Sequence, residues 1–243
     1  MILRKVHYET PAPFGQDRLI PIWLATLALW QKSREVHFNS AAQMLDFFHL
    51  PKDGLHYRRL LEAFQRIFGA TIFFGTEENS TANKLLDWTR FHFLDRMKLW
   101  CGTGDRSSAA EVKPDDNVIT LSEFFYNEIE QHRIPVGREV VASLAQAPGI
   151  LDFYLWLAWK SWTLNHAPSR IPIVGPAGLC DHLAAAHYSS PRRFRHLIVQ
   201  WLAKVKLYWP ECRAFVTSDR RFLVVPASRK SPAVRVIDRH AVP

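Results

Sequence analysis

Apolar side chains recur with two different spacings along the first 132 residues of the chain, one typical of helices and one typical of strands. Residues 17–32, 41–50 and 55–68 place apolar side chains every three to four positions, which predicts three helices. Residues 34–38 alternate polar with apolar side chains and predict a short strand between the first two helices. Further strands are expected between residues 70 and 100. The predicted order is helix, strand, helix, helix and two strands.

Two short motifs predict where helices begin. Ser40 is followed three residues later by Gln43, and Thr120 is followed in the same way by Glu123. This is the spacing of a capping box, in which two side chains bind the free N–H groups at the start of a helix. Thr120 is therefore expected to open a helix that ends near residue 132.

The same order of elements returns between residues 133 and 227. Residues 150–164 predict a helix that is apolar nearly all round and therefore deeply buried. A short extended run, a short helix and a longer helix over residues 191–209 follow. Residues 212–227 predict a hairpin of two strands. We interpret this recurrence as a structural repeat.

The helix over residues 191–209 combines an apolar stripe with a basic first turn. Ser190 is a favourable N-cap, and Pro191 is favoured as the first helical residue. The stripe expected in the core comprises Phe194, Leu197, Ile198, Trp201, Leu202, Val205 and Tyr208. Arginines fill the first turn, although the N-terminus of a helix already bears partial positive charge. This arrangement predicts an anionic partner, with a solvated basic surface as the alternative.

Positive charge is concentrated at the same end of the chain. The whole chain has a formal net charge of +8. Residues 189–243 contain 12 Lys and Arg against 3 Asp and Glu, whereas the first 188 residues contain 19 against 20. A basic tail over residues 228–243, expected to be unstructured, accounts for part of this excess. The rest lies on the basic helix and the hairpin, as expected of a local surface for a polyanion.

The order of elements predicts an α+β, mainly helical fold of two winged-helix domains in tandem, each with a helix-turn-helix. The domains are expected at residues 1–132 and 133–227. In such a domain the third helix enters a groove of DNA, and the hairpin forms the wing. The basic turn of the helix over residues 191–209 and the hairpin tip, with Arg220 and Arg221, would then face DNA.

The first half carries a weaker version of this basic surface. Arg58, Arg59 and Arg66 lie on the outer side of the predicted helix over residues 55–68, and Glu62 lies among them. Glu62 would repel phosphates, so the sequence leaves two alternatives for these arginines: a contact with DNA and a contact with another protein.

The sequence contains no recognised enzymatic motif, so we expect a protein that is not an enzyme. There is no GxxxxGK[ST] or GxGxxG loop for phosphates, and no CxxC or HExxH pattern for a metal. The stretch around His92 holds one histidine where a rolling-circle nickase needs two. We expect no metal and no cofactor. Three separated cysteines and the lack of a long apolar run indicate free thiols, a reducing cytoplasm and no membrane span.

Five segments share a recognisable order and spacing. They are PIWLATLALWQKSREVHF (21–38), LHYRRLLEAFQRIFGATIFF (55–74), LSEFFYNEI (121–129), PGILDFYLWLAWKSWTL (148–164) and RRFRHLIVQWLAKVKLYWPECRAFV (192–216). In these segments the chain resembles plasmid-encoded replication initiator proteins of the RepA type, which consist of two winged-helix domains. The loops depart from the family pattern, and the tail after Pro226 matches nothing in it.

This resemblance implies a cytoplasmic protein that binds double-stranded DNA at origin repeats, helps to open adjacent AT-rich DNA, and recruits the host replication initiator and helicase. It implies that the C-terminal domain makes the main sequence contact, while the N-terminal domain contributes backbone contacts and a possible homodimer interface. The recognition role falls on Arg192, Arg193, Arg195, His196 and Gln200. The phosphate role falls on Lys204, Arg220 and Arg221, with Arg58, Arg59 and Arg66 as counterparts in the first domain.

Two other functions fit the same pattern. A tandem winged-helix transcriptional regulator would use the same surface without any role in replication. A protein-interaction module would carry the basic end only incidentally. Binding to an array of direct repeats, compared with a single inverted repeat, separates the initiator from the regulator, and absence of tight DNA binding at moderate salt would favour the module.

Overall fold

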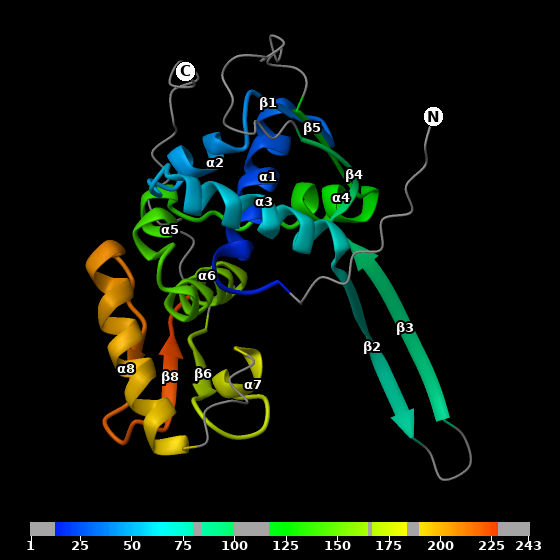
Figure 1. Ribbon diagram of the computed structural model, residues 1–243. Coiled ribbons are helices and arrows are strands. Elements are labelled where there is room, and N and C mark those ends of the chain that lie inside the picture. The colour runs from blue at the N-terminus through cyan, green and yellow to red at the C-terminus, as the bar shows by residue number, and fades with distance from the viewer. Residues whose placement is uncertain (1–12, 80–83, 100–116, 165–166, 184–189, 228–243) are drawn as a thin grey trace, which may run out of the picture. The chain divides into compact units, whose positions relative to one another are not determined.

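The computed structural model describes residues 13–79, 84–99, 117–164, 167–183 and 190–227 (Figure 1). The chain divides into two compact units, Met1–Arg133 and Ile134–Pro243. Both units combine helices with small antiparallel sheets, so the fold is α+β and mainly helical, as predicted. Within the described ranges, no helix is long and apolar enough to cross a membrane.

The first unit contains helices, a three-stranded sheet and an additional hairpin. Its elements are η1 (Gly15–Arg18), α1 (Leu19–Gln31), β1 (Glu35–Phe38), α2 (Ala42–Phe47), α3 (Gly54–Gly69), β2 (Thr71–Asn79), β3 (Lys84–His92), β4 (Leu94–Lys98), β5 (Asn117–Leu121) and α4 (Glu123–Gln131). Pro21 lies in the first turn of α1, where proline is tolerated because the N–H it lacks has no helical partner. Asp53 caps α3 by accepting a hydrogen bond from the N–H of His56 at 2.8 Å.

The sheet of the first unit has the order β1–β5–β4 and is antiparallel throughout. β1 pairs with β5 from Glu35 opposite Thr120 to Phe38 opposite Asn117. The elements α1, β1, α2, α3, β4 and β5 therefore follow the order of a winged helix, with the first strand paired to the last.

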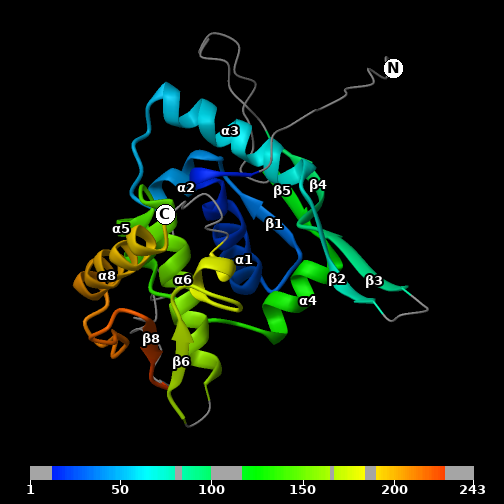
Figure 2. The same ribbon diagram turned by 90° about the horizontal axis from the view of Figure 1, so that it is seen from below.

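The hairpin of β2 and β3 is an addition to that order. Its strands pair from Thr71 opposite His92 to Asn79 opposite Lys84, and they form a separate two-stranded sheet. In both views the hairpin runs away from the helices of its own unit (Figure 1 and Figure 2). From the sequence, the strands directly after the third helix were predicted to form the wing. In the structure β2 and β3 follow that helix, but β4 and β5 occupy the positions of the wing.

The core of the first unit forms where α1, α3 and the sheet meet. Trp23 is 1% exposed, and its ring packs edge-on against Phe38 and Phe64 at centroid distances of 4.9 and 6.3 Å. Such aromatic pairs add about 0.5–1.5 kcal/mol each beyond the burial of their area. Ile119 and Leu121 of β5 are fully buried beside them. Burial of this side of α3 leaves its opposite side facing outward.

Helix α4 begins later than the capping motif predicted. Thr120 is 7% exposed and lies in β5, opposite Glu35. Ser122 is the actual N-cap: its hydroxyl accepts from the N–H of Phe125 at 3.2 Å and donates to the carbonyl of His92 at 2.6 Å. The prediction was wrong because pairing of β5 with two neighbouring strands outweighs the local capping preference of one threonine.

The second unit repeats the winged-helix order after one extra helix. Its elements are α5 (Arg138–Leu144), α6 (Pro148–Thr163), β6 (Ser169–Pro172), α7 (Leu179–His182), α8 (Pro191–Tyr208), β7 (Phe215–Val216) and β8 (Phe222–Val225). Its sheet has the order β6–β8–β7, so the first strand again pairs with the last. The helix α5 was not predicted.

The core of the second unit lies between α6, α8 and the sheet. Phe194, Ile198, Leu202 and Val205 of α8 are buried, as predicted. Tyr208 is 38% exposed against the prediction, because Trp209 is buried in its place and meets the ring of Tyr154 at 5.8 Å. Helix α6 is not buried all round either, since Trp159 and Trp162 are 38% and 42% exposed.

Tyr154 ties α6 to the start of α5. Its side chain is fully buried, and its hydroxyl accepts a hydrogen bond from the N–H of Gly137 at 2.9 Å. Burial disfavours the charged phenolate and raises the pKa of Tyr154 to about 12. The residue therefore stays neutral and hydrogen-bonded well into the alkaline range.

We expect alkaline pH to destabilise the second unit through Tyr154. Above pH 10 the phenol ionises in the unfolded chain but stays protonated in the fold until about pH 12, so stability falls as pH rises between these values. Tyr154→Phe should weaken this pH dependence. It should also lower the free energy of unfolding at neutral pH by about 1–2 kcal/mol, because the Gly137 N–H loses its acceptor. Thermal melts of both proteins at neutral and alkaline pH test this, and an equal alkaline loss in both would contradict it.

Candidate nucleic-acid interface

The basic turn at the start of α8 is oriented by its cap and by its buried face. The side chain of Ser190 accepts a hydrogen bond from the N–H of Arg193 at 3.4 Å, and Pro191 is the first helical residue. Phe194 and Ile198 point into the core, at 1% and 0% exposure. With the apolar side fixed in this way, the basic side of the helix must face outward.

The predicted recognition residues of α8 follow this outward side. The exposed ones are Arg192, Arg193, His196, Gln200 and Lys204. Arg195 is half-buried, and its Nε atom is buried without a hydrogen-bond partner among the described residues. The structure therefore presents four of the five recognition candidates fully and Arg195 partly, together with the phosphate candidate Lys204.

The turn between β7 and β8 presents the other two predicted cations. The carboxylate of Asp219 accepts from the hydroxyl of Thr217 at 2.6 Å and from the backbone N–H of Arg221 at 3.0 Å. These hydrogen bonds, that of Thr217 above all, hold the pKa of Asp219 below its ordinary value. Arg220 adopts a left-handed backbone conformation, with φ of 55°, and its N–H donates to the carbonyl of Thr217 at 2.8 Å. The side chains of Arg220 and Arg221 are exposed.

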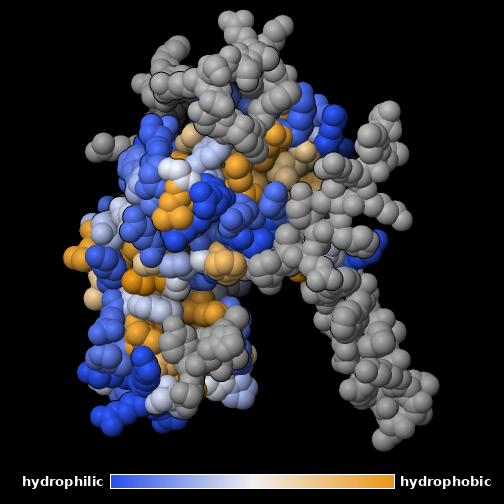
Figure 3. Space-filling model, viewed as in Figure 1, coloured by the Kyte–Doolittle hydropathy of each residue, from blue (hydrophilic) through white to orange (hydrophobic). Residues whose placement is uncertain are grey.

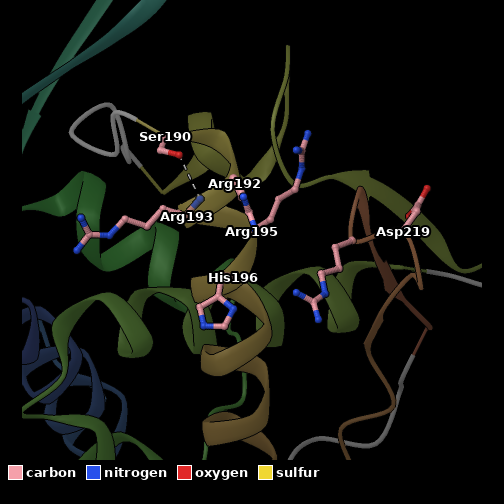
Figure 4. Close-up of a pocket in the computed structure, with 7 residues that line it drawn as sticks. Ser190, Arg192, Arg193, Arg195, His196 and Asp219 are labelled. Carbon is pink, nitrogen blue, oxygen red and sulfur yellow. Dashed lines mark hydrogen bonds between the residues drawn. The ribbon is translucent and has the colours of Figure 1, made fainter.

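The start of α8 and this turn line one pocket of about 590 Å³. Its lining residues are Ser190, Arg192, Arg193, Arg195, His196, Asp219 and Arg220. In Figure 4, Arg193 extends from one side of α8, while Asp219 lies on the other side, on the turn. Two elements that are separate in sequence thus contribute arginines to the same cavity.

The cations of this surface outnumber its acid, Asp219. Within the ranges that the structure describes, no Asp or Glu forms an ion pair with the arginines of α8 or of the turn. The dipole of α8 adds partial positive charge at its first turn. Figure 3 shows hydrophilic residues gathered where α8 begins and where β7 turns into β8. The arrangement can bind several oxyanions, as a run of phosphates would present them.

In the first unit, two of the three predicted cations remain candidates. Arg58 and Arg59 are exposed in the first half of α3, and neither forms an ion pair with any acid in the described residues. They stand on the side of α3 that faces away from Phe64 and the core. A second, smaller basic surface therefore exists on the third helix of the first unit.

Arg66, the third predicted cation, is a structural residue. Its guanidinium donates two hydrogen bonds to the carboxylate of Asp17, at 2.7 and 3.0 Å, and the two side chains are only 11% and 4% exposed. Its Cζ atom lies 4.7 Å above the ring of Phe14. The hydrogen bond with Asp17 raises the pKa of Arg66. The helical pattern placed Arg66 outward but could not show that the chain before α1 covers it.

One exposed cation of the second unit, Arg170, was not predicted from the sequence. Arg170 in β6 is exposed, and its Cζ atom lies 3.8 Å above the ring of Phe222 in β8. The pairing of β6 with β8 brings Arg170 next to the turn between β7 and β8. No local signal marks it, because its position depends on contacts between residues that are far apart in the sequence.

The described residues offer no set of metal ligands. No group of three His, Cys, Asp or Glu side chains in this part of the chain could hold a metal ion. Cys180 and Cys212 are free thiols, and burial raises the pKa of Cys212; Cys101 lies outside the described residues.

Comparison with known proteins identifies a family for part of the chain. Residues 54–171 match the family described as plasmid-encoded RepA protein, which confirms the resemblance. The match runs from the start of α3 to β6 and stops before α8. No curated protein matches the chain.

Solved structures show the same fold. The crystal structure of domains 2 and 3 of RctB aligns with a TM-score of 0.55 at 14% identity, covering 89% of this chain and 83% of that one. A selenomethionine derivative of the same two domains gives 0.56 at 12% identity, with 88% and 82% coverage. At such low identity the comparison establishes the fold alone, and it extends over both units.

Proposed function

We propose that this chain, whose residues 54–171 match the family of plasmid-encoded RepA proteins, is a plasmid replication initiator that binds double-stranded DNA at repeated origin sequences. The main contact would be made by α8 and the turn between β7 and β8. The observation that carries the proposal is the pocket in which arginines of these two elements meet; they outnumber its acid, Asp219, and form no ion pair with an acid of the described residues.

The start of α8 would enter the major groove. A guanidinium can donate two parallel hydrogen bonds to the O6 and N7 atoms of guanine, or to a phosphate. Arg192 and Arg193 are exposed in the first turn, and His196 and Gln200 continue the same side of the helix. These residues would read bases, while the buried Phe194 and Ile198 hold the helix at a fixed rotation.

The turn between β7 and β8 would grip the DNA backbone. Asp219 holds the turn through hydrogen bonds to Thr217 and Arg221, so little conformational freedom is lost when DNA binds. Arg220 and Arg221 would bind phosphates on one side of α8, and Lys204 would do so further along the helix. Phosphate contacts position the protein on DNA, and base contacts specify the sequence.

Two units in tandem suit a site made of repeats. The exposed pair Arg58 and Arg59 on α3 would supply a secondary backbone contact from the first unit. The same unit would provide a homodimer interface. As an initiator the protein would help to open adjacent AT-rich DNA and recruit the host initiator and helicase in the cytoplasm. In this proposal it works by binding alone, as a non-enzymatic protein without a metal or cofactor.

Salt dependence tests the proposal directly. If Arg195, Lys204, Arg220 and Arg221, with Arg58 and Arg59 of the first unit, each neutralise one phosphate, log affinity should fall with log salt with a slope of about −5. We expect this slope in fluorescence anisotropy titrations with a duplex of direct repeats taken from the origin. A slope near zero, or no tight binding at moderate salt, would contradict any role based on DNA. Stronger binding to a single inverted repeat than to direct repeats would instead identify a transcriptional regulator.

A further inference from the structure

We propose that Arg170 of β6 is a further contact to the DNA backbone, held in place by the ring of Phe222. This inference rests on the proposed function and extends the binding surface to a third element, the first strand of the sheet. It assigns a role to a residue that belongs neither to α8 nor to the turn.

The strand register places Arg170 on the outer face of the sheet. Ile171 and Leu223 point into the core, at 7% and 0% exposure. Side chains alternate along a strand, so Arg170 and Phe222 share the opposite face. Arg170 is paired with Val224, two residues beyond Phe222, which makes Arg170 and Phe222 diagonal neighbours on adjacent strands.

The ring of Phe222 fixes the guanidinium without using its hydrogen-bond donors. The Cζ atom of Arg170 lies 3.8 Å from the ring centroid, the distance of a group in direct contact with the face of the ring. A guanidinium held in this way keeps the N–H groups at its edge available for a phosphate. Because the side chain is already ordered, binding loses less conformational entropy than it would with a free arginine.

The charges around this ring indicate an anionic partner. Arg221 also approaches Phe222, with its Cζ atom 5.9 Å from the centroid. Two guanidiniums beside one ring repel each other. Asp219, the neighbouring acid, has its pKa lowered mainly by the hydroxyl of Thr217, with smaller effects of Arg221 and Arg170. A phosphate between the two arginines would relieve their repulsion, because one acid that also holds the turn cannot neutralise both.

The test compares variants of Arg170 in the full-length protein. With Arg170→Gln we expect about tenfold weaker binding to the direct-repeat duplex, as for loss of a hydrogen bond to a charged group. The salt slope should become shallower by about 0.9. Affinity for an unrelated duplex should fall by the same factor, because a backbone contact carries no sequence information. Arg213→Gln, which removes another exposed arginine of the same unit, should change neither quantity.

Two more variants separate charge from position. Arg170→Lys keeps the charge but cannot stack as a planar group, so its salt slope should equal that of the wild type while its affinity falls. Phe222→Leu removes the ring that holds Arg170, and it should weaken binding by about the same factor as Arg170→Gln, about tenfold. Equal affinity and slope for Arg170→Gln and wild type would overturn this inference and leave the proposed function intact. Absence of DNA binding by the wild type would overturn the proposed function itself.

Discussion

Arg192→Ala combined with Arg193→Ala is expected to weaken binding to origin repeats by about 100-fold, at a melting temperature equal to that of the wild type. Each good contact between an arginine and a guanine discriminates by about 1–3 kcal/mol, and every 1.4 kcal/mol is a factor of ten in affinity. Both side chains are exposed, and neither forms an ion pair with an acid in the described residues. Their removal therefore takes away DNA contacts without leaving a buried charge unpaired.

The measurement is a pair of titrations at fixed moderate salt, with the direct-repeat duplex and with an unrelated duplex of equal length. A recognition role predicts a larger loss on the repeats than on the unrelated duplex, because base contacts specify and phosphate contacts do not. Arg213→Ala is the matched control, since it removes one exposed cation of the same unit outside the pocket. Unchanged affinity of the double variant for the repeats would place the recognition surface elsewhere.

Arg66→Ala is expected to lower the stability of the first unit by about 3 kcal/mol, the lower end of the range for breaking a buried ion pair. The carboxylate of Asp17, with 4% side-chain exposure, would lose the two hydrogen bonds that it receives from Arg66. It would keep only the N–H of Phe14, at 2.9 Å, as a described hydrogen-bond donor. An uncompensated charge at a buried position explains the size of the effect.

Thermal and denaturant unfolding of the full-length protein measure this loss. Arg59→Ala is the control on the same helix: its side chain is exposed, so its effect on stability should stay within about 0.5 kcal/mol. The two variants should behave in the opposite way towards DNA. Arg59→Ala should weaken binding, whereas Arg66→Ala should bind like the wild type at temperatures where it is folded. If Arg66→Ala melts like the wild type but binds DNA more weakly, our assignment of Arg66 fails.

Two of the arginines of α3, Arg59 and Arg66, illustrate how far a helical pattern can be taken. Both Arg59 and Arg66 lie outside the buried apolar stripe of α3, which includes Leu60, Phe64 and Ile67. The pattern identifies the side of α3 that packs on its own unit. It cannot reveal a second layer, and here the segment from Phe14 to Arg18 covers one end of the outer side. Charge on an outer face is therefore a DNA candidate only where no other segment reaches it.

The sequence by itself determined the features that depend on neighbours within a few positions. The cap at Ser190 and the tight turn around Asp219 arise from contacts between residues close in the chain. The spacing of Phe194 and Ile198 within one helix likewise marks the side of α8 that is buried. Because such contacts form wherever the local sequence allows them, the basic turn of α8 and the arginines of the hairpin could be predicted.

Only the tertiary structure decided the features that depend on distant partners. Thr120 is a strand residue because β1 and β4 pair with β5. Arg66 is a structural residue because Asp17 folds against it. Arg170 lies near the turn between β7 and β8 because β6 pairs with β8. Each of these contacts requires closing a long loop. That happens only when the whole core forms, so the free energy that selects the partner is not encoded in either segment alone.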